Sequence, residues 1–200
     1  MVALERDAGL VRTLRQQRAL RHVTIVETDV LHWSWPKTEF SVVANLPFVN
    51  SAAILAHLLG DPSVPLRRAD VIVQWELAVK QTAVWPSTLK STLWRAWYDI
   101  AVVRRLARTA FSPTPSVDAA LLRVTRRPTP LVPVTEHRLY RRFLTEAFAS
   151  SGPPGRLSAR LSRIEIKRLA PVLGFDPSSR PRDLDARQWA ALFSFVELDD

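Results

Sequence analysis

The sequence predicts an α/β fold in which a mainly parallel sheet is followed by a small all-helical domain. Through residue 127, short runs rich in Val, Ile and Leu alternate with segments of helical periodicity. Such near-continuous apolar strands are typical of parallel sheets covered on both faces. Three prolines then fall within six positions, and the rest of the chain has helical periodicity. We therefore expect a sheet domain at 1–127, a Pro-rich linker at 128–133 and a helical domain at 134–200.

The apolar runs and their boundaries place the individual elements. Asp7 is expected to cap the helix after the first strand, and a second helix is expected from Ser51 to the Gly60-Asp61-Pro62 break. The expected strands are 2–5, 23–26, 41–45, 69–76, 99–106 and 117–127, and the strand at 69–76 is expected to lead into a helix. The expected helices of the second domain are 137–150, 160–175 and 184–195.

Composition excludes several classes of protein and site. No apolar run approaches the roughly 18 residues of a membrane helix, and the first eighteen residues do not have the pattern of a signal peptide. The absence of Cys excludes disulfides, thiolate zinc sites and cysteine nucleophiles, and the four scattered His lack ligand spacing. We expect a cytoplasmic protein with no metal and no membrane partner.

Positive charge is concentrated in one segment. The net charge is +9, and residues 101–130 contain six Arg opposed only by Asp118. Such clustering is typical of a polyanion-binding surface. Two alternatives are a genome that encodes Arg in place of Lys, and Arg side chains that are simply solvated. The five Arg predicted to contact nucleic acid are Arg104, Arg105, Arg123, Arg126 and Arg127.

Polar residues end three consecutive expected strands, at Glu5, Asp29 and Asn45. Ligands of open α/β sheets bind beyond the carboxyl ends of the strands. An acid in such a position commonly accepts hydrogen bonds from nucleotide ribose or from an adenine amino group, although it also commonly caps the next helix. Three such residues in register favour a nucleotide site.

Asn45-Leu46-Pro47-Phe48 is the most specific chemical pattern in the sequence. The exocyclic amine of a base is a weak nucleophile because its lone pair is delocalised into the ring. An Asn amide oxygen and a neighbouring backbone carbonyl can accept both amine hydrogens, proline fixes the backbone, and the aromatic ring can stack on an unpaired base. The pattern therefore predicts chemistry on a base amine.

The motifs resemble those of the S-adenosylmethionine-dependent rRNA adenine N6-methyltransferases, over essentially all 200 residues. Gln74-Trp75-Glu76, and Phe rather than Tyr at position 48, resemble the Erm-type macrolide-resistance branch rather than the small-subunit dimethylases. The second shared motif consists of Phe111, Pro113, Pro115, Val117 and Asp118.

The resemblance implies a Rossmann-like methyltransferase sheet and a role for each site residue. Glu5 would bind the cofactor ribose, Asp29 the cofactor adenine, and Asn45 both the cofactor and the target amine. Leu46 and Pro47 would complete the catalytic turn, and Phe48 and Phe111 would line the adenine pocket. The implied cofactor is S-adenosylmethionine, and the implied substrate is one adenine of large-subunit (23S) rRNA, whose methylation confers macrolide resistance. We expect a monomer.

One departure from the family pattern affects the expected activity. The family has a strand and a Gly-rich loop before the position of Glu5, whereas the five glycines here, at 9, 60, 152, 155 and 174, form no such loop. We therefore expect an N-terminally truncated family member. Two alternatives stay open, namely a small-subunit rRNA adenine dimethylase and a catalytically dead RNA-binding remnant.

Overall fold

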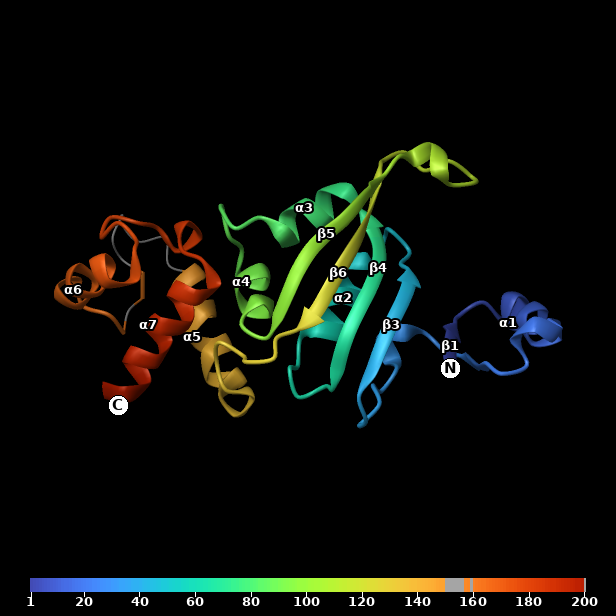
Figure 1. Cartoon of the computed structure of the whole chain (residues 1–200), viewed down its shortest axis with the longest axis horizontal. Helices are drawn as coiled ribbons and strands as arrows, with labels where there is room; N and C mark the ends of the chain where they lie inside the picture. The colour runs from blue at the N-terminus through green and yellow to red at the C-terminus, as the bar shows by residue number, and fades with distance from the viewer. Residues whose placement is uncertain (150–156, 159, 200) are drawn as a thin grey trace.

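The computed structural model describes residues 1–149, 157, 158 and 160–199, and it divides the strands between two sheets. β1 (Val2–Glu5) and β2 (Thr24–Glu27) form a parallel pair connected by α1 (Ala8–Gln16). A four-stranded sheet has the order β3-β4-β6-β5 (Figure 1). Its strands are β3 (Phe40–Asn45), β4 (Leu66–Gln74), β5 (Tyr98–Leu106) and β6 (Ala119–Arg126).

The two sheets share no ladder. β1 pairs only with β2, and β3 pairs only with β4, so each has one edge without a strand partner among the described residues. In Figure 1 the β1–α1–β2 unit lies beyond β3 at one end of the molecule. One face of β3 is also uncovered, since Val43 is 86% exposed. The expectation of a sheet covered on both faces is therefore wrong at this strand.

One strand, β6, departs from the mainly parallel expectation. β3 and β4 are parallel, with α2 (Ser51–Leu59) as their crossover helix, but β6 is antiparallel to both β4 and β5. Residues 107–118 connect β5 to β6 without an α-helix that could carry the chain back along the sheet, so the two strands pair as a long hairpin. An apolar run alone does not distinguish a parallel strand from an antiparallel one.

The helices lie where the periodicity predicts them, with one addition. α3 (Trp75–Thr82) follows β4, and the C-terminal segment contains α5 (His137–Ala149), α6 (Arg163–Leu173) and α7 (Ala186–Asp199). The unpredicted helix is α4 (Leu89–Arg95), whose first turn carries a capping box between Thr88 and Ser91. None of the described helices is both long enough and apolar enough to cross a membrane.

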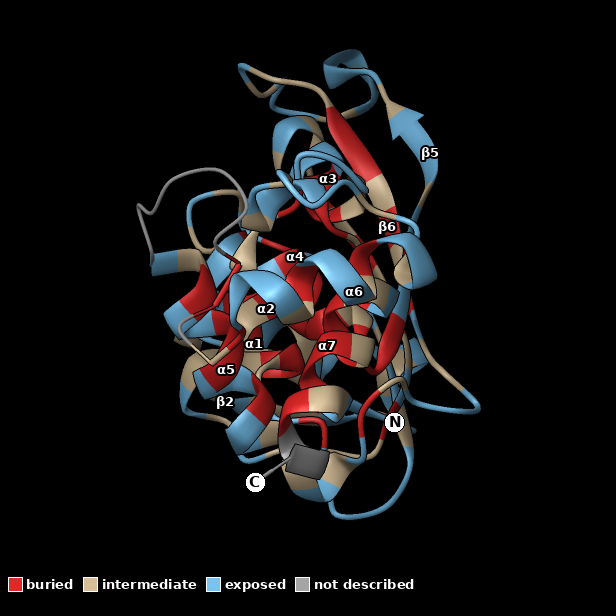
Figure 2. Cartoon of the chain, turned by 90° about the vertical axis from the view of Figure 1, so that its left-hand side faces the viewer, coloured by how far each residue is buried: buried red, intermediate tan, exposed pale blue. Residues whose placement is uncertain are grey.

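One continuous core connects the four-stranded sheet with the C-terminal helices. The Pro-rich segment runs beside the start of β5, where the Leu131 amide donates to the Ala96 carbonyl at 2.8 Å and the Trp97 indole donates to the Val132 carbonyl at 2.8 Å. Tyr140 of α5 packs edge-on against Trp97, with ring centroids 5.8 Å apart. In Figure 2 the buried surfaces of α4, α5 and α7 meet in the interior.

Candidate functional site

The Asn45–Phe48 turn follows β3 directly and leaves two acceptor groups unengaged. Asn45 is the last residue of β3, and the Leu46 amide continues the ladder by donating to the Ile72 carbonyl at 3.1 Å. The Pro47 carbonyl accepts hydrogen bonds from the Asn50 amide and the Ser51 hydroxyl, at 3.0 and 2.9 Å. Among the described residues, the exposed Asn45 side-chain amide and the Leu46 carbonyl have no such partner. These oxygens are available to an amine.

Phe48 and Phe111 are brought together from distant parts of the sequence. Phe111 ends a short 3-10 helix (Arg108–Ala110) in the segment between β5 and β6. Its ring centroid lies 6.5 Å from that of Phe48, with the ring planes at 73°. Both side chains are half-buried. The turn after β3 therefore has an aromatic wall that a planar base can contact.

Asp118 fixes the segment that carries Phe111. Its carboxylate accepts hydrogen bonds from the Arg108 amide at 3.0 Å and from the Arg105 guanidinium at 2.7 Å, and its carbonyl accepts one from the Trp75 amide at 3.0 Å. The Arg105 guanidinium also lies 4.7 Å from the centroid of the Trp75 ring, a cation–π distance. The Arg108 amide and the Arg105 guanidinium hold the pKa of Asp118 below its usual value.

Glu5 and Asp29 lie at the carboxyl ends of the neighbouring parallel strands β1 and β2. One oxygen of Glu5 accepts hydrogen bonds from the Arg6 and Asp7 amides, at 2.7 and 2.8 Å. One oxygen of Asp29 accepts from the Leu31 amide at 2.9 Å, and the other lies 3.7 Å from the Arg6 guanidinium. Each acid therefore uses one oxygen in a local turn. Neither is connected to Asn45 by strand pairing, because β3 belongs to the other sheet.

The Arg residues of β5 and β6 divide into exposed and internally bonded groups. A bulge at Val102–Arg104 shifts the register of β5 against β6. Arg104 and Arg108 are exposed, and within the described part of the chain neither guanidinium makes a hydrogen bond or a close ion pair, although the charge of Arg108 helps to lower the pKa of Asp118. Arg105 is paired with Asp118, and Arg123 donates to Asp70 at 2.7 Å.

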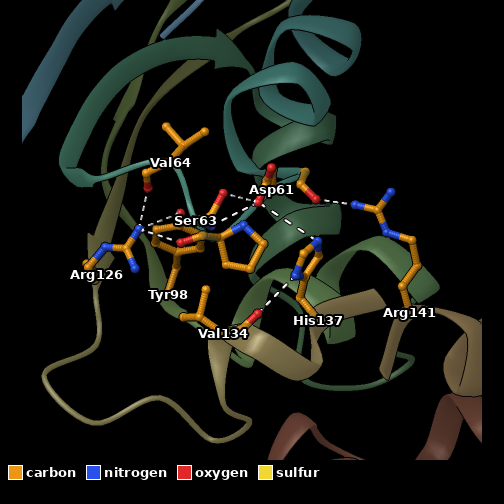
Figure 3. A network of polar contacts seen from close by, with 10 residues as sticks. Asp61, Ser63, Val64, Tyr98, Arg126, Val134, His137 and Arg141 are labelled. Carbon is orange, nitrogen blue, oxygen red and sulfur yellow. Dashed lines mark hydrogen bonds and ion pairs between the residues drawn. The ribbon is translucent and has the colours of Figure 1, made fainter. Parts of the chain in front are cut away.

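Arg126 and Arg127, also predicted to contact phosphate, hold the protein's own backbone. The Arg126 guanidinium donates to the Leu66 and Pro62 carbonyls, at 2.9 and 3.0 Å. It also donates to the Val64 carbonyl and lies against Tyr98 (Figure 3). Arg127 donates to the Arg95 carbonyl at 2.8 Å, pairs with Asp99 at 2.7 Å, and is only 15% exposed. These contacts give both side chains structural roles.

Comparison with known protein families identifies the family of this chain. A family model described as ribosomal RNA adenine dimethylase matches residues 1–190. The chain belongs to this family.

Relatives from two branches of the rRNA adenine dimethylase family resemble the chain. The mycinamicin-resistance protein MyrB of Micromonospora griseorubida is 32% identical over 198 residues, covering 96% of this chain but 62% of MyrB. The ribosomal RNA small subunit methyltransferase A of Synechococcus sp. is 31% identical, covering 96% of this chain and 71% of that protein. The chain therefore spans about three-fifths of MyrB and seven-tenths of the other relative.

A solved structure supports the fold. The crystal structure of the 23S rRNA methyltransferase ErmE superposes with a TM-score of 0.82 at 22% identity, covering 98% of this chain and 81% of ErmE. The methyltransferase-type α/β fold with a helical C-terminal part is thereby confirmed. The predicted resemblance to the rRNA adenine methyltransferases is confirmed by the family model.

The cofactor of this methyltransferase family, S-adenosylmethionine, fits part of the arrangement. Glu5 and Asp29 each have a second carboxylate oxygen, and such oxygens suit ribose hydroxyls and an adenine amine. For the methionine half, the sequence has no closely spaced glycines after any strand. The fit is therefore limited to the adenosine half.

Sequence reasoning missed the supporting residues of the site. Arg108 was counted in the basic segment but not assigned a contact, although its exposed side chain and its neighbour Phe111 share one segment. Sequence analysis places Asp118 in the second shared motif and opposite the Arg residues, but it does not predict that Asp118 bonds the Arg105 guanidinium and the Arg108 amide. The position of Asp118 beside several Arg was the available signal.

Proposed function

We propose that this protein transfers a methyl group from S-adenosylmethionine to N6 of an adenine in ribosomal RNA. The observation that carries the proposal is the pair of unengaged acceptors, the Asn45 amide and the Leu46 carbonyl, beside the Phe48–Phe111 wall. This arrangement presents hydrogen-bond acceptors at the edge of a base and an aromatic surface at its face. Family membership supports the same reaction.

The side chains act mainly by positioning the nucleophile. S-adenosylmethionine supplies a methyl group already activated on a sulfonium, so little general-base strength is required. Asn45 and the Leu46 carbonyl accept the two N6 hydrogens and favour the pyramidal amine, while Phe48 stacks on the unpaired adenine. Phe111 closes the pocket from the side, and Pro47 keeps the turn rigid.

Glu5 and Asp29 are proposed to hold the adenosine half of the cofactor. Glu5 would accept hydrogen bonds from the ribose hydroxyls through the oxygen that does not bond the Arg6 and Asp7 amides. Asp29 would accept a hydrogen bond from the cofactor adenine amine. Asn45 completes the proposed cofactor contacts where the target amine meets the methyl group.

Ribosomal RNA is proposed to follow the β5–β6 hairpin towards the site. Arg104 and Arg108 are exposed cations of that hairpin, and the side chains of Arg105 and Arg123 are 59% and 38% exposed. The proposal is less well supported for Arg126 and Arg127, because their guanidinium groups already bond within the protein. We place the protein in the cytoplasm, where its substrate is assembled.

The large-subunit RNA is the proposed substrate, with macrolide resistance as its consequence. This assignment is supported by the likeness to MyrB and by Phe48 in the catalytic turn. To test it, purified 23S and 16S rRNA are each incubated with the protein and radiolabelled S-adenosylmethionine. Label in N6-methyladenine from 23S rRNA supports the assignment, and label confined to 16S rRNA selects the small-subunit branch instead.

RNA binding without methyl transfer is a second candidate function. It is favoured by the separation of Glu5 from Asn45, since β1 and β3 share no ladder within the described residues. Equilibrium dialysis with S-adenosylmethionine separates the candidates. Micromolar affinity supports the enzyme, whereas RNA binding with no cofactor affinity supports this second function.

A further inference from the structure

A half-open pocket of about 120 Å³ lies between the sheet half of the molecule and the C-terminal helices. Its walls come from the segment between α3 and α4, from α4 itself, and from the start of α7. The Ser87 amide donates to the Arg182 carbonyl at 2.8 Å and so joins the two halves beside the pocket. This pocket is separate from the Asn45–Phe48 turn.

Three polar atoms from the residues lining this pocket are buried without a partner. They are the hydroxyls of Ser87 and Thr92 and the Nε–H of Arg95, none of which bonds to a described residue. Ser87 and Thr92 are 8% and 1% exposed. Native proteins satisfy most buried polar groups, so three such atoms around one pocket indicate a missing partner.

The charges around the pocket favour an anion. Arg95, Arg127 and Arg187 line it, opposed by Asp185. One oxygen of Asp185 accepts from the Arg187 and Gln188 amides at the start of α7, at 2.8 and 2.9 Å. Burial and the neighbouring Arg127 lower the pKa of Arg95, while Asp99 and Asp185 act in the opposite direction.

The known pairings leave donors unused. Arg127 pairs with Asp99, and Arg95 donates to the Thr82 carbonyl through its terminal nitrogen, at 2.7 Å in both cases. The Nε–H of Arg95 can only donate, and each hydroxyl has a proton to donate. The exposed Arg187 guanidinium has no described partner. The missing partner must therefore accept several hydrogen bonds.

We propose that this pocket binds a small tetrahedral oxyanion of the phosphate class. A single water accepts at most two hydrogen bonds, whereas phosphate oxygens accept from several donors at once. A water needs about 10–15 Å³ of such space, so the pocket is large enough for a group of this size. The bound anion would tie Thr92 and Arg95 of α4 to Arg187 of α7.

Thermal unfolding in inorganic phosphate tests the proposal. The unfolding midpoint is measured against phosphate concentration, with chloride keeping the ionic strength constant, for wild type, Thr92→Val and Arg187→Gln. Thr125→Val, at an exposed Thr of β6, and Arg163→Gln, at an exposed Arg of α6, are the matched controls. A ligand that binds only the folded state raises the midpoint according to its affinity.

We expect phosphate to raise the midpoint of wild type and both controls, and Thr92→Val and Arg187→Gln each to weaken the apparent affinity at least ten-fold. Because affinity is read from the phosphate dependence within each variant, a change in basal stability does not affect the comparison. No phosphate dependence in wild type, or equal dependence in Thr92→Val, would overturn the proposal. The assay uses neither RNA nor S-adenosylmethionine, so its outcome is independent of methyl transfer.

A competition experiment distinguishes the two sources of the phosphate group. An RNA hairpin is bound to the protein, and inorganic phosphate is added at constant ionic strength. Release of the hairpin from wild type but not from Thr92→Val identifies an RNA phosphate as the occupant. Retention of the hairpin while phosphate still raises the midpoint identifies free phosphate.

Discussion

At the scale of single residues, the Arg side chains show how similar sequence positions acquire different roles. Arg104 and Arg126 belong to the same basic segment, yet Arg104 is exposed, whereas Arg126 holds the turn that leads into β4 through three carbonyls. A guanidinium has five N–H donors, so it can bridge several carbonyls in one turn. Net charge therefore identifies a candidate polyanion-binding segment, but only geometry identifies the cations that are available.

Replacing Arg126 tests its structural role. Arg126→Gln should lower the free energy of unfolding by about 2–4 kcal/mol, because charge-assisted hydrogen bonds to partly buried carbonyls are lost. The matched control, Arg104→Gln, removes an exposed cation and should change stability by less than about 0.5 kcal/mol. Urea unfolding measures both, and equal stabilities of the two variants would contradict the assignment.

The salt dependence of RNA binding tests the exposed pair. Each phosphate contact contributes about 0.7 to the log–log slope for single strands, so Arg104→Gln combined with Arg108→Gln should flatten it by about one to two. Arg163→Gln on α6 should leave the slope unchanged. An unchanged slope in the double variant would remove Arg104 and Arg108 from the RNA surface.

Phe48 is expected to act through stacking. Phe48→Ala should weaken the productive RNA complex by about 1–3 kcal/mol because a base loses its aromatic contact, whereas Phe48→Tyr keeps the ring and should be nearly silent. The ratio kcat/KM for RNA measures both variants. A large loss in Phe48→Tyr would contradict this role, because the ring face is unchanged and only a hydroxyl is added at the end of the ring.

At the scale of elements, hydrophobic periodicity predicts where the strands and helices lie, but it does not predict the direction of a strand. The strands and the helices after residue 137 lie close to their predicted positions, because apolar spacing reports which face is buried. The antiparallel pairing of β6 was not predictable, since a buried strand has the same pattern in either direction. α4 was missed because its buried face includes Ser91, Thr92 and Trp94 in a polar segment.

The segment between β5 and β6 depends on one carboxylate, which gives a pH prediction. The pKa of Asp118 is lowered in the folded state, so its stabilising bonds are complete above the usual Asp pKa of about 3.9 and are lost as pH falls through the folded-state value. The chemical shift of the Arg108 amide should therefore titrate below about pH 3.9. A midpoint at or above that value would contradict the proposed ordering. The shift should lose this titration in Asp118→Asn.

At the scale of the whole molecule, the C-terminal helices and the four-stranded sheet share one core. Sequence predicted a linker and a separate helical segment, and the proline-rich stretch does lack α-helix and strand. What sequence could not show is that this stretch hydrogen-bonds along residues 96–97 and that Tyr140 packs on Trp97. These contacts join residues more than thirty positions apart, and no local pattern reports them.

The two halves of the candidate site belong to different sheets of the molecule. Asn45 and Phe48 belong to the four-stranded sheet, whereas Glu5 and Asp29 belong to the β1–β2 pair. Strand-end polarity predicted each residue's place at a carboxyl end, which the structure confirms for Glu5 and Asn45. It did not predict that the two sets lie on different sheets, because strand order is not encoded in the strands themselves.

The most direct test of methyl transfer at the Asn45–Phe48 turn compares wild type with Asn45→Ala. Each is incubated with 23S rRNA and S-adenosylmethionine, and N6-methyladenine is quantified by mass spectrometry of the digested RNA, with RNA affinity measured in parallel. The account predicts methylated adenine with wild type and none with Asn45→Ala, at similar RNA affinity. Equal methylation by the two proteins, or none by wild type, would contradict it.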